Sequence, residues 1–286
     1  MKGSIEGWGS GVVGMTIFSG SLPATRAALE GFPPLFLTGA RATLAAALAA
    51  LCLALLRQPL PGRRELVSLV TVSLGVVVGF PLLTALALQH VTSAHAIVFI
   101  GLLPLSTALF GVLRGGERPR PLFWLFSGLG AAAVSGFALS QDGVASPIGD
   151  LAMIAAVIVC GLGYAEGAML TRRLGGWQVI SWALVLSSPL MLLLSVLTLP
   201  VSPHEITAPA WLGLAYVSVF SMFIGFAFWY HGLARGGTAT VGQLQLLQPF
   251  LGLAFASLLL HEPVSATMIG TAGVVVLCVA TARRFA

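Results

Sequence analysis

Three amide side chains interrupt an apolar run near the C-terminus: Gln243, Gln245 and Gln248, just before Pro249. Polar side chains inside a hydrophobic helix turn toward protein or water, where they find hydrogen-bond partners. On a helix, Gln245 and Gln248 share a face with the proline, whereas Gln243 points elsewhere. We expect Gln245 to face a substrate, with Gln243 and Gln248 as further candidates. Hydrogen bonding between helices is the alternative role for all three amides.

Pro249 has a counterpart in an earlier apolar run, Pro104. A proline inside a helix leaves the carbonyl four residues earlier unpaired, here those of Gln245 and Ile100. In hydrocarbon such a carbonyl needs a neighbouring donor or a wet cavity. The pair of proline kinks predicts the centre of a pathway, and simple packing kinks are the alternative.

Few ionisable side chains lie within the apolar runs. Arg41 lies inside its predicted helix, where a guanidinium needs hydrogen-bond partners. A substrate carboxylate could supply them. If backbone carbonyls or Glu30 supply them instead, Arg41 has a scaffold role. Glu166 either couples transport to protons or extends toward the basic residues at the end of its helix. His95 either titrates during transport or forms a hydrogen bond at the interface. Neither His95 nor Glu166 has an obvious acid partner, so we expect transport without an obligatory proton.

Aromatic side chains are candidates for the apolar part of a binding site. Phe80 and Tyr164 lie deep in their runs, and Phe99 follows His95 by one helical turn. We expect these side chains, with His95 and Arg41, to contact substrate.

The elements that must position these residues follow from composition. Hydrophobic residues make up 57% of the 286 residues and charged residues only 8%, too few to cover a soluble domain. Apolar runs of about 20 residues predict helices, because barrel strands would be about half as long. We expect an all-α membrane protein with ten spans, at 7–24, 33–56, 66–89, 93–113, 121–139, 149–171, 178–198, 209–233, 238–260 and 264–282.

The basic residues divide unequally between the two sides of such a bundle. Of the 14 Lys and Arg residues, twelve fall on the side of the N-terminus, and Arg26 is the one on the other side. Basic loops face the cytoplasm, so we expect both termini inside a bacterial inner membrane and no nucleic acid as a partner. The three cysteines lie in apolar runs, and no metal-site or phosphate-loop spacing occurs. We therefore expect no metal and no cofactor.

An internal repeat appears when the chain is shifted by 145 residues. The shift places Pro104 on Pro249 and Glu117 on Glu262. Each half would hold five spans, and an odd number requires the second half to be inverted. We expect repeats at 1–144 and 145–286, the arrangement of secondary transporters that rock around a central site. The spacings Gly75/Gly79 and Gly163/Gly167 predict close helix contacts.

Motifs around the two prolines carry a family resemblance. One run begins Thr92-Ser93-Ala94-His95-Ala96 and leads through Pro104 to Gly116-Glu117-Arg118-Pro119; the other leads from Gly237-Thr238-Ala239-Thr240 through Pro249 to His261-Glu262-Pro263. The chain resembles the EamA-type branch of the drug/metabolite transporter superfamily. That resemblance implies ten helices in two inverted halves, and the length and central aromatic residues resemble the family's aromatic amino acid exporters. His261 stands where the family often has a glycine.

The function that we expect is export of small amphipathic metabolites by alternating access, with aromatic or other apolar amino acids as the candidate substrates. Amides and carbonyls would bind the polar end of the substrate, and aromatic rings the apolar end. A membrane-embedded enzyme acting on lipid is the alternative, although no acid–base or nucleophile constellation supports it. A structural or assembly protein is a third class. The sequence leaves the exact substrate, the coupling ion and the oligomeric state open.

Overall fold

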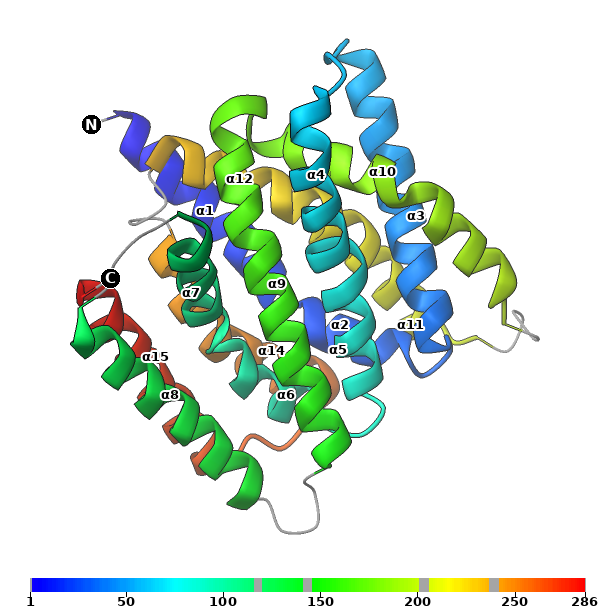
Figure 1. Cartoon of the computed structure of the whole chain (residues 1–286). Coiled ribbons are helices and arrows are strands. Elements are labelled where there is room, and N and C mark those ends of the chain that lie inside the picture. Colours follow the sequence, from blue (N-terminus) through cyan, green and yellow to red (C-terminus); the bar gives the residue numbers. More distant parts are fainter. Residues whose placement is uncertain (1, 116–119, 141–145, 201–205, 237–241, 286) are drawn as a thin grey trace.

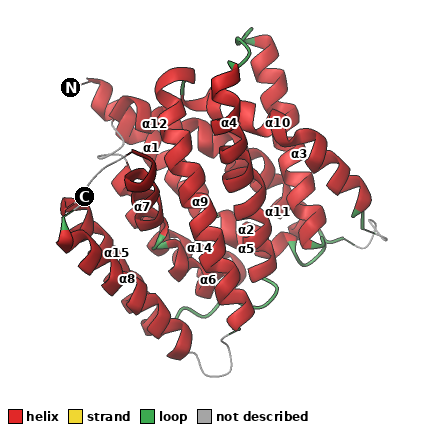
Figure 2. Ribbon diagram, in the orientation of Figure 1, coloured by secondary structure: helices red, strands yellow, loops and turns green. Residues whose placement is uncertain are grey.

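The computed structural model describes residues 2–115, 120–140, 146–200, 206–236 and 242–285, and these ranges hold helices joined by turns and short loops (Figure 2). Glu117 and Gly237–Thr240 of the two sequence motifs lie outside the described residues. Within the described ranges, six helical stretches are long and apolar enough to cross a membrane by length and composition. Shorter apolar helices supply further segments, so the chain is an all-helical multi-pass membrane protein.

The helices form ten segments in the order of the predicted spans. The first half contains α1 (Lys2–Ser19) with α2 (Ser21–Ala28), α3 (Pro34–Leu55), α4 (Arg63–Val72) continuing through η1 (Ser73–Gly79) into α5 (Phe80–Ala87), α6 (Ser93–Ile100) with α7 (Leu103–Gly115), and α8 (Pro121–Ser140). The second half contains α9 (Pro147–Leu174), α10 (Gly176–Leu197), α11 (Ala208–Ala215) continuing through η3 (Tyr216–Ile224) into α12 (Gly225–Gly236), η4 (Gly242–Leu247) with α14 (Gln248–Leu260), and α15 (Ala266–Ala282) followed by η5 (Arg283–Phe285).

The repeat of 145 residues is present in the backbone. Five helices of the first half, α1, α4, α5, α7 and α8, begin 145 residues before α9, α11, α12, α14 and α15. The wide π-helical turns η1 and η3 also overlap under this shift. Figure 1 shows α1 and α9 beginning at opposite ends of the bundle, and both chain termini at the same end. The two repeats therefore run in opposite directions.

One expectation about helix continuity needs correction. The first span is not one helix, because the chain bends at Gly20 between α1 and α2. At the two predicted kinks the regular α-helix is interrupted just before the proline: Pro104 and Pro249 are the second residues of α7 and α14, after a turn at Gly101 and after the 3-10 turn η4. A proline is tolerated there because the first helical turn does not need its N–H.

Contacts between the halves hold the bundle together. The most extensive pairings join α3 to α10, α1 to α12 and α8 to α15, each across the two halves (Figure 1). The predicted glycine contact is confirmed, since a Cβ on Gly75 would lie 2.5 Å from the Val159 carbonyl oxygen and 3.0 Å from the Gly163 Cα. Such close approach brings η1 and α9 together beside the centre of the molecule.

Candidate substrate site

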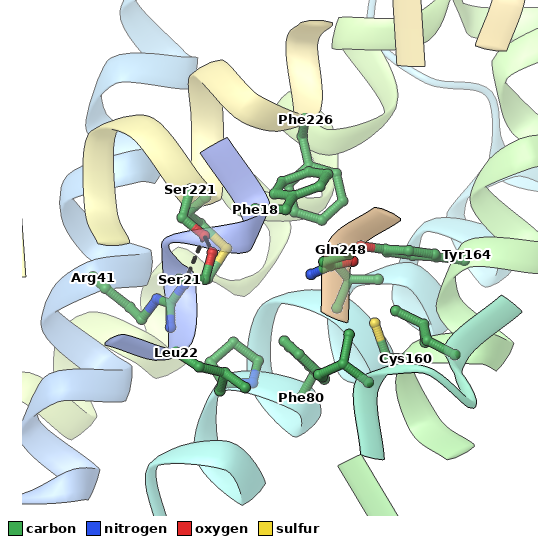
Figure 3. A pocket seen from close by; sticks show the side chains of 15 residues that line it. Phe18, Ser21, Leu22, Arg41, Phe80, Cys160, Tyr164, Ser221, Phe226 and Gln248 are labelled. Carbon is green, nitrogen blue, oxygen red and sulfur yellow. Dashed lines mark hydrogen bonds between the residues drawn. The ribbon is translucent and has the colours of Figure 1, made fainter. Parts of the chain in front are cut away.

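A cavity lies between the helices of both halves (Figure 3), and the free space in and around it, open solvent included, is about 460 Å³. Four of the predicted site residues line it: Arg41, Phe80, Tyr164 and Gln248. The other lining residues are Phe18, Ser21, Leu22, Val76, Pro81, Ile100, Leu103, Cys160, Ser221, Met222 and Phe226.

The cavity lies where the two repeats meet. Three pairs of lining residues are 145 positions apart, and so occupy equivalent places in the two halves: Val76 and Ser221, Pro81 and Phe226, and Leu103 and Gln248. Equivalent residues can face one space only near the axis that relates the halves. The cavity therefore has the location that alternating access requires of a transport site.

Irregular backbone surrounds this cavity. Val76 lies in η1, Ser221 lies in η3, and Ser21 is the first residue of α2 after the bend at Gly20. Leu103 and Gln248 are the first residues of α7 and α14, after their turns. Turns and π-helical segments inside a membrane leave backbone groups that need protein or water as partners, so they are tolerated where they line a cavity.

One corner of the cavity is polar. The Arg41 side chain is only 5% exposed, and its Nη2 donates to the Val217 carbonyl oxygen and to Ser221 Oγ, both at 3.4 Å. Ser221 Oγ also lies 2.6 Å from Ser21 Oγ. The buried Nε of Arg41 has no hydrogen-bond partner among the described residues. The guanidinium thus has weak partners and spare donors beside the cavity.

The rest of the wall is mainly aromatic and aliphatic. The Phe226 ring meets Phe18 edge to face with centroids 4.8 Å apart, and it meets Tyr164 at 6.0 Å. Figure 3 shows Tyr164 and Cys160 across the cavity from Arg41, with Gln248 between them and the arginine. The site therefore combines a cation at one end with an apolar surface at the other end and one amide between them.

Of the other predicted amides and prolines, Gln245 and Pro249 are described and are not among the residues that line the cavity. Gln245 is 5% exposed in η4 and belongs to the buried residues, and Pro249 is also buried. The side chains of Gln243 and Pro104 lie outside the described part of the chain. Of the three amides, Gln248 is therefore the one that the described structure brings to the cavity.

His95 and Phe99 lie in a separate buried cluster. His95 Nε2 is 2.7 Å from Asp150 Oδ1, and its ring lies 5.7 Å from that of Phe99. The expectation that His95 has no acid partner is wrong, because Asp150 belongs to the first turn of α9, far away in the sequence. Glu166 is buried near the other end of α9 and accepts a hydrogen bond from Ser68 Oγ.

Most of the lining residues that the sequence analysis missed are apolar or small and gave no chemical signal. Ser221 is an exception, because Ser218 and Ser221 lie one turn apart in an otherwise apolar run. Applying the 145-residue shift to the predicted residue Gln248 would have found Leu103, which occupies the equivalent position in the first half. Within the described residues, no group of three or more His, Cys, Asp or Glu side chains could hold a metal ion.

Comparison with known proteins agrees with the internal repeat. The model of the "EamA-like transporter family" matches the chain twice, over residues 7–139 and 147–283. A Bacillus subtilis (strain 168) protein named "Uncharacterized transporter YdeK" is 64% identical over 286 residues, covering 100% of both chains. "Uncharacterized transporter YvbV" from the same organism is 26% identical over 256 residues, 86% of this chain and 81% of that protein.

A solved structure described as "Crystal structure of protein" shares the fold. Its TM-score is 0.65 at 21% sequence identity, over 99% of this chain and 97% of that one. At this identity the likeness extends to the architecture only. The family model, in contrast, covers nearly the whole sequence, and so this chain belongs to the EamA-like family of membrane transporters and is not an enzyme.

Proposed function

We propose that the protein is a secondary transporter that exports small amphipathic metabolites with a carboxylate group, with aromatic and other apolar amino acids as the leading candidates. One observation carries this proposal: a buried arginine with spare donors faces an aromatic cavity where the two repeats meet. A carboxylate fits the planar donors of Arg41, and a ring or branched side chain fits the opposite wall.

The cavity lining also indicates which functional group of a substrate would bind more strongly. Among the described residues that line the cavity there is no acidic side chain, so a substrate ammonium group would rely on the Gln248 amide oxygen and on backbone carbonyls. The carboxylate therefore contributes more to binding than the ammonium group does. This preference supports acids and amino acids over amines as substrates.

Alternating access would tilt the two halves about the turns that surround the cavity. We place both termini in the cytoplasm of a bacterial plasma membrane, because twelve of 14 basic residues lie on their side of the bundle. The expectation of transport without a proton rested on the absence of an acid partner for both His95 and Glu166, and Asp150 removes that premise for His95.

Counterflow in proteoliposomes tests the proposal. Vesicles loaded with unlabelled L-phenylalanine should accumulate external radiolabelled L-phenylalanine transiently. External 3-phenylpropionate, which keeps the carboxylate, should compete with the label, whereas phenethylamine, which keeps the amine, should compete weakly. Stronger competition by phenethylamine would overturn the role of Arg41, and no counterflow with any apolar amino acid would overturn the substrate class.

Cys160 offers a second measurement at the same cavity. In a variant with Cys52 and Cys278 replaced by alanine, a small thiol reagent should label Cys160 during turnover. Substrates that occupy the cavity should slow this labelling, and compounds that do not bind should leave the rate unchanged. Protection by phenethylamine but not by 3-phenylpropionate would contradict the proposed orientation.

A further inference from the structure

The first turns of α6 and α9 lie at the end of the bundle away from the two termini (Figure 1), and they carry a buried titratable pair. His95 on α6 has no exposed surface, Asp150 in the first turn of α9 is 8% exposed, and Nε2 to Oδ1 is 2.7 Å. The imidazole lies between two rings, 5.7 Å from Phe99 and 5.0 Å from Phe137. Its Nδ1 is buried and has no hydrogen-bond partner among the described residues.

The charge of this pair depends on one proton. With Nε2–H donating to the Asp150 carboxylate, a neutral His95 leaves a net charge of minus one in an apolar cluster. Proton uptake at Nδ1 makes the pair neutral overall, which burial favours over an uncompensated carboxylate. A hydronium ion gives this proton to Nδ1 and leaves a water molecule.

Among the described residues near this end, the other charged groups are engaged elsewhere or exposed. Glu262 accepts hydrogen bonds from Ser93 N, Ser93 Oγ and Ala94 N at 3.1, 2.7 and 2.8 Å, so it caps α6. Arg26 of α2 donates to the Leu88 carbonyl oxygen. Three further groups at this end are exposed: Glu30, His90 and His261. The described side chains of α8, α14 and α15 include no acidic or basic group.

The pair joins the two repeats without being repeated itself. The positions that correspond to His95 and Asp150 under the 145-residue shift are Thr240 and Ile5, and neither side chain titrates. A contact needed only to hold the two halves together would be expected twice, once at each equivalent place. A single titratable contact between α6 and α9 instead makes the two ends of the bundle chemically different.

We propose that His95 and Asp150 form a proton-binding site that controls opening of this end of the bundle. The protonated pair is an ion pair that ties α6 to α9 and keeps the end closed. Loss of the proton weakens the tie, so the open state gains population as the pH of the facing solution rises. The site binds a proton whatever the transported substrate is.

Direct observation of His95 tests proton binding. Histidine labelled with ¹⁵N in the purified protein, held in lipid nanodiscs, shows whether one or both ring nitrogens carry hydrogen. We assign the His95 signal by its loss in His95→Gln, and expect it to change between pH 5 and pH 9. In Asp150→Asn the change should move to a different pH, because the carboxylate charge is gone. An identical His95 signal at both pH values, or a response unaffected by Asp150→Asn, would overturn the proposal.

A thiol at Val91 tests the opening of the same end. Val91 is 4% exposed, and its Cγ1 lies 2.8 Å from where a Cβ on Gly149 of α9 would be. In the cysteine-free protein, Val91→Cys should react with a hydrophilic thiol reagent about fivefold faster at pH 8 than at pH 5.5. Rates are divided by those of Ser265→Cys, an exposed position at the same end, because thiolate content also rises with pH.

Matched variants test whether the pH dependence of labelling comes from this pair. His95→Gln and Asp150→Asn should each abolish the pH dependence of Val91→Cys labelling. His90→Gln, an exposed histidine beside the start of α9, should leave it intact. If pH dependence persists in both pair variants, or is absent from the parent, the pair does not control opening. Neither experiment uses a substrate, so failure of the proposed substrate class would not affect the result.

Discussion

Replacement of Arg41 by methionine separates a substrate-binding role from a scaffold role. Both hydrogen bonds of Arg41 Nη2 are 3.4 Å long, beyond the usual range of about 2.7–3.2 Å, and Nε has no partner among the described residues. Two well-made hydrogen bonds from a charged group would contribute about 3–6 kcal/mol. Bonds this long contribute much less, and methionine removes a poorly compensated buried charge while keeping much of the side-chain volume. We therefore expect Arg41→Met to change stability by no more than about 1 kcal/mol.

The assay measures thermal stability and substrate affinity on the same preparation. A change of about 1 kcal/mol corresponds to about 2–4 °C in the apparent Tm of a chain of this size. Loss of a charged hydrogen bond to the substrate should weaken L-phenylalanine binding by about 10- to 150-fold. An apparent Tm lowered by more than about 10 °C, with phenylalanine affinity unchanged in the folded fraction, would show that Arg41 supports the scaffold instead.

Three further predictions concern packing, capping and topology. Gly75→Ala should lower stability by about 1–3 kcal/mol, because the new Cβ would lie 2.5 Å from the Val159 carbonyl oxygen. The control is Gly128→Ala, where a Cβ would have nothing within 4 Å. This control should be neutral or mildly stabilising in the same thermal assay. Glu262→Ala should lower the apparent Tm, since it removes three hydrogen bonds at the start of α6, at about 2–3 kcal/mol in total; an unchanged Tm would contradict this stabilising role. A cysteine at position 146 should react with an impermeant reagent from outside intact cells, and labelling only after lysis would reverse the proposed orientation.

The long helices could be predicted from the sequence because the bilayer determines both their length and their composition. The predicted span 33–56 corresponds to Pro34–Leu55, and 178–198 corresponds to Gly176–Leu197. The repeat was also visible, because a shift that aligns Pro104 with Pro249 also aligns the helices on which they lie. These features depend on hydrophobicity and on the backbone geometry of proline. Both can be read from the local sequence.

The bends and the long-range partners could not be predicted in the same way. Ser73–Gly79 forms a π-helical turn within an uninterrupted apolar run, where hydrophobicity is the same for either helix type. Asp150 lies 55 residues from His95, and their contact depends on how α6 packs on α9. Of the predicted amides, Gln248 reaches the cavity and Gln245 is buried in η4, because the 3-10 turn changes the helical phase on which their shared face was based.

The two halves contribute different kinds of residue to the cavity. At each pair of equivalent lining positions the first half supplies an aliphatic residue, Val76, Pro81 or Leu103. The second half supplies a polar or aromatic residue, Ser221, Phe226 or Gln248. Arg41 then contacts Ser221, so the polar corner of the cavity is made by a cation from one repeat and its partner from the other. A movement of one half against the other must change this contact, and the strength with which the site holds a carboxylate would change with it.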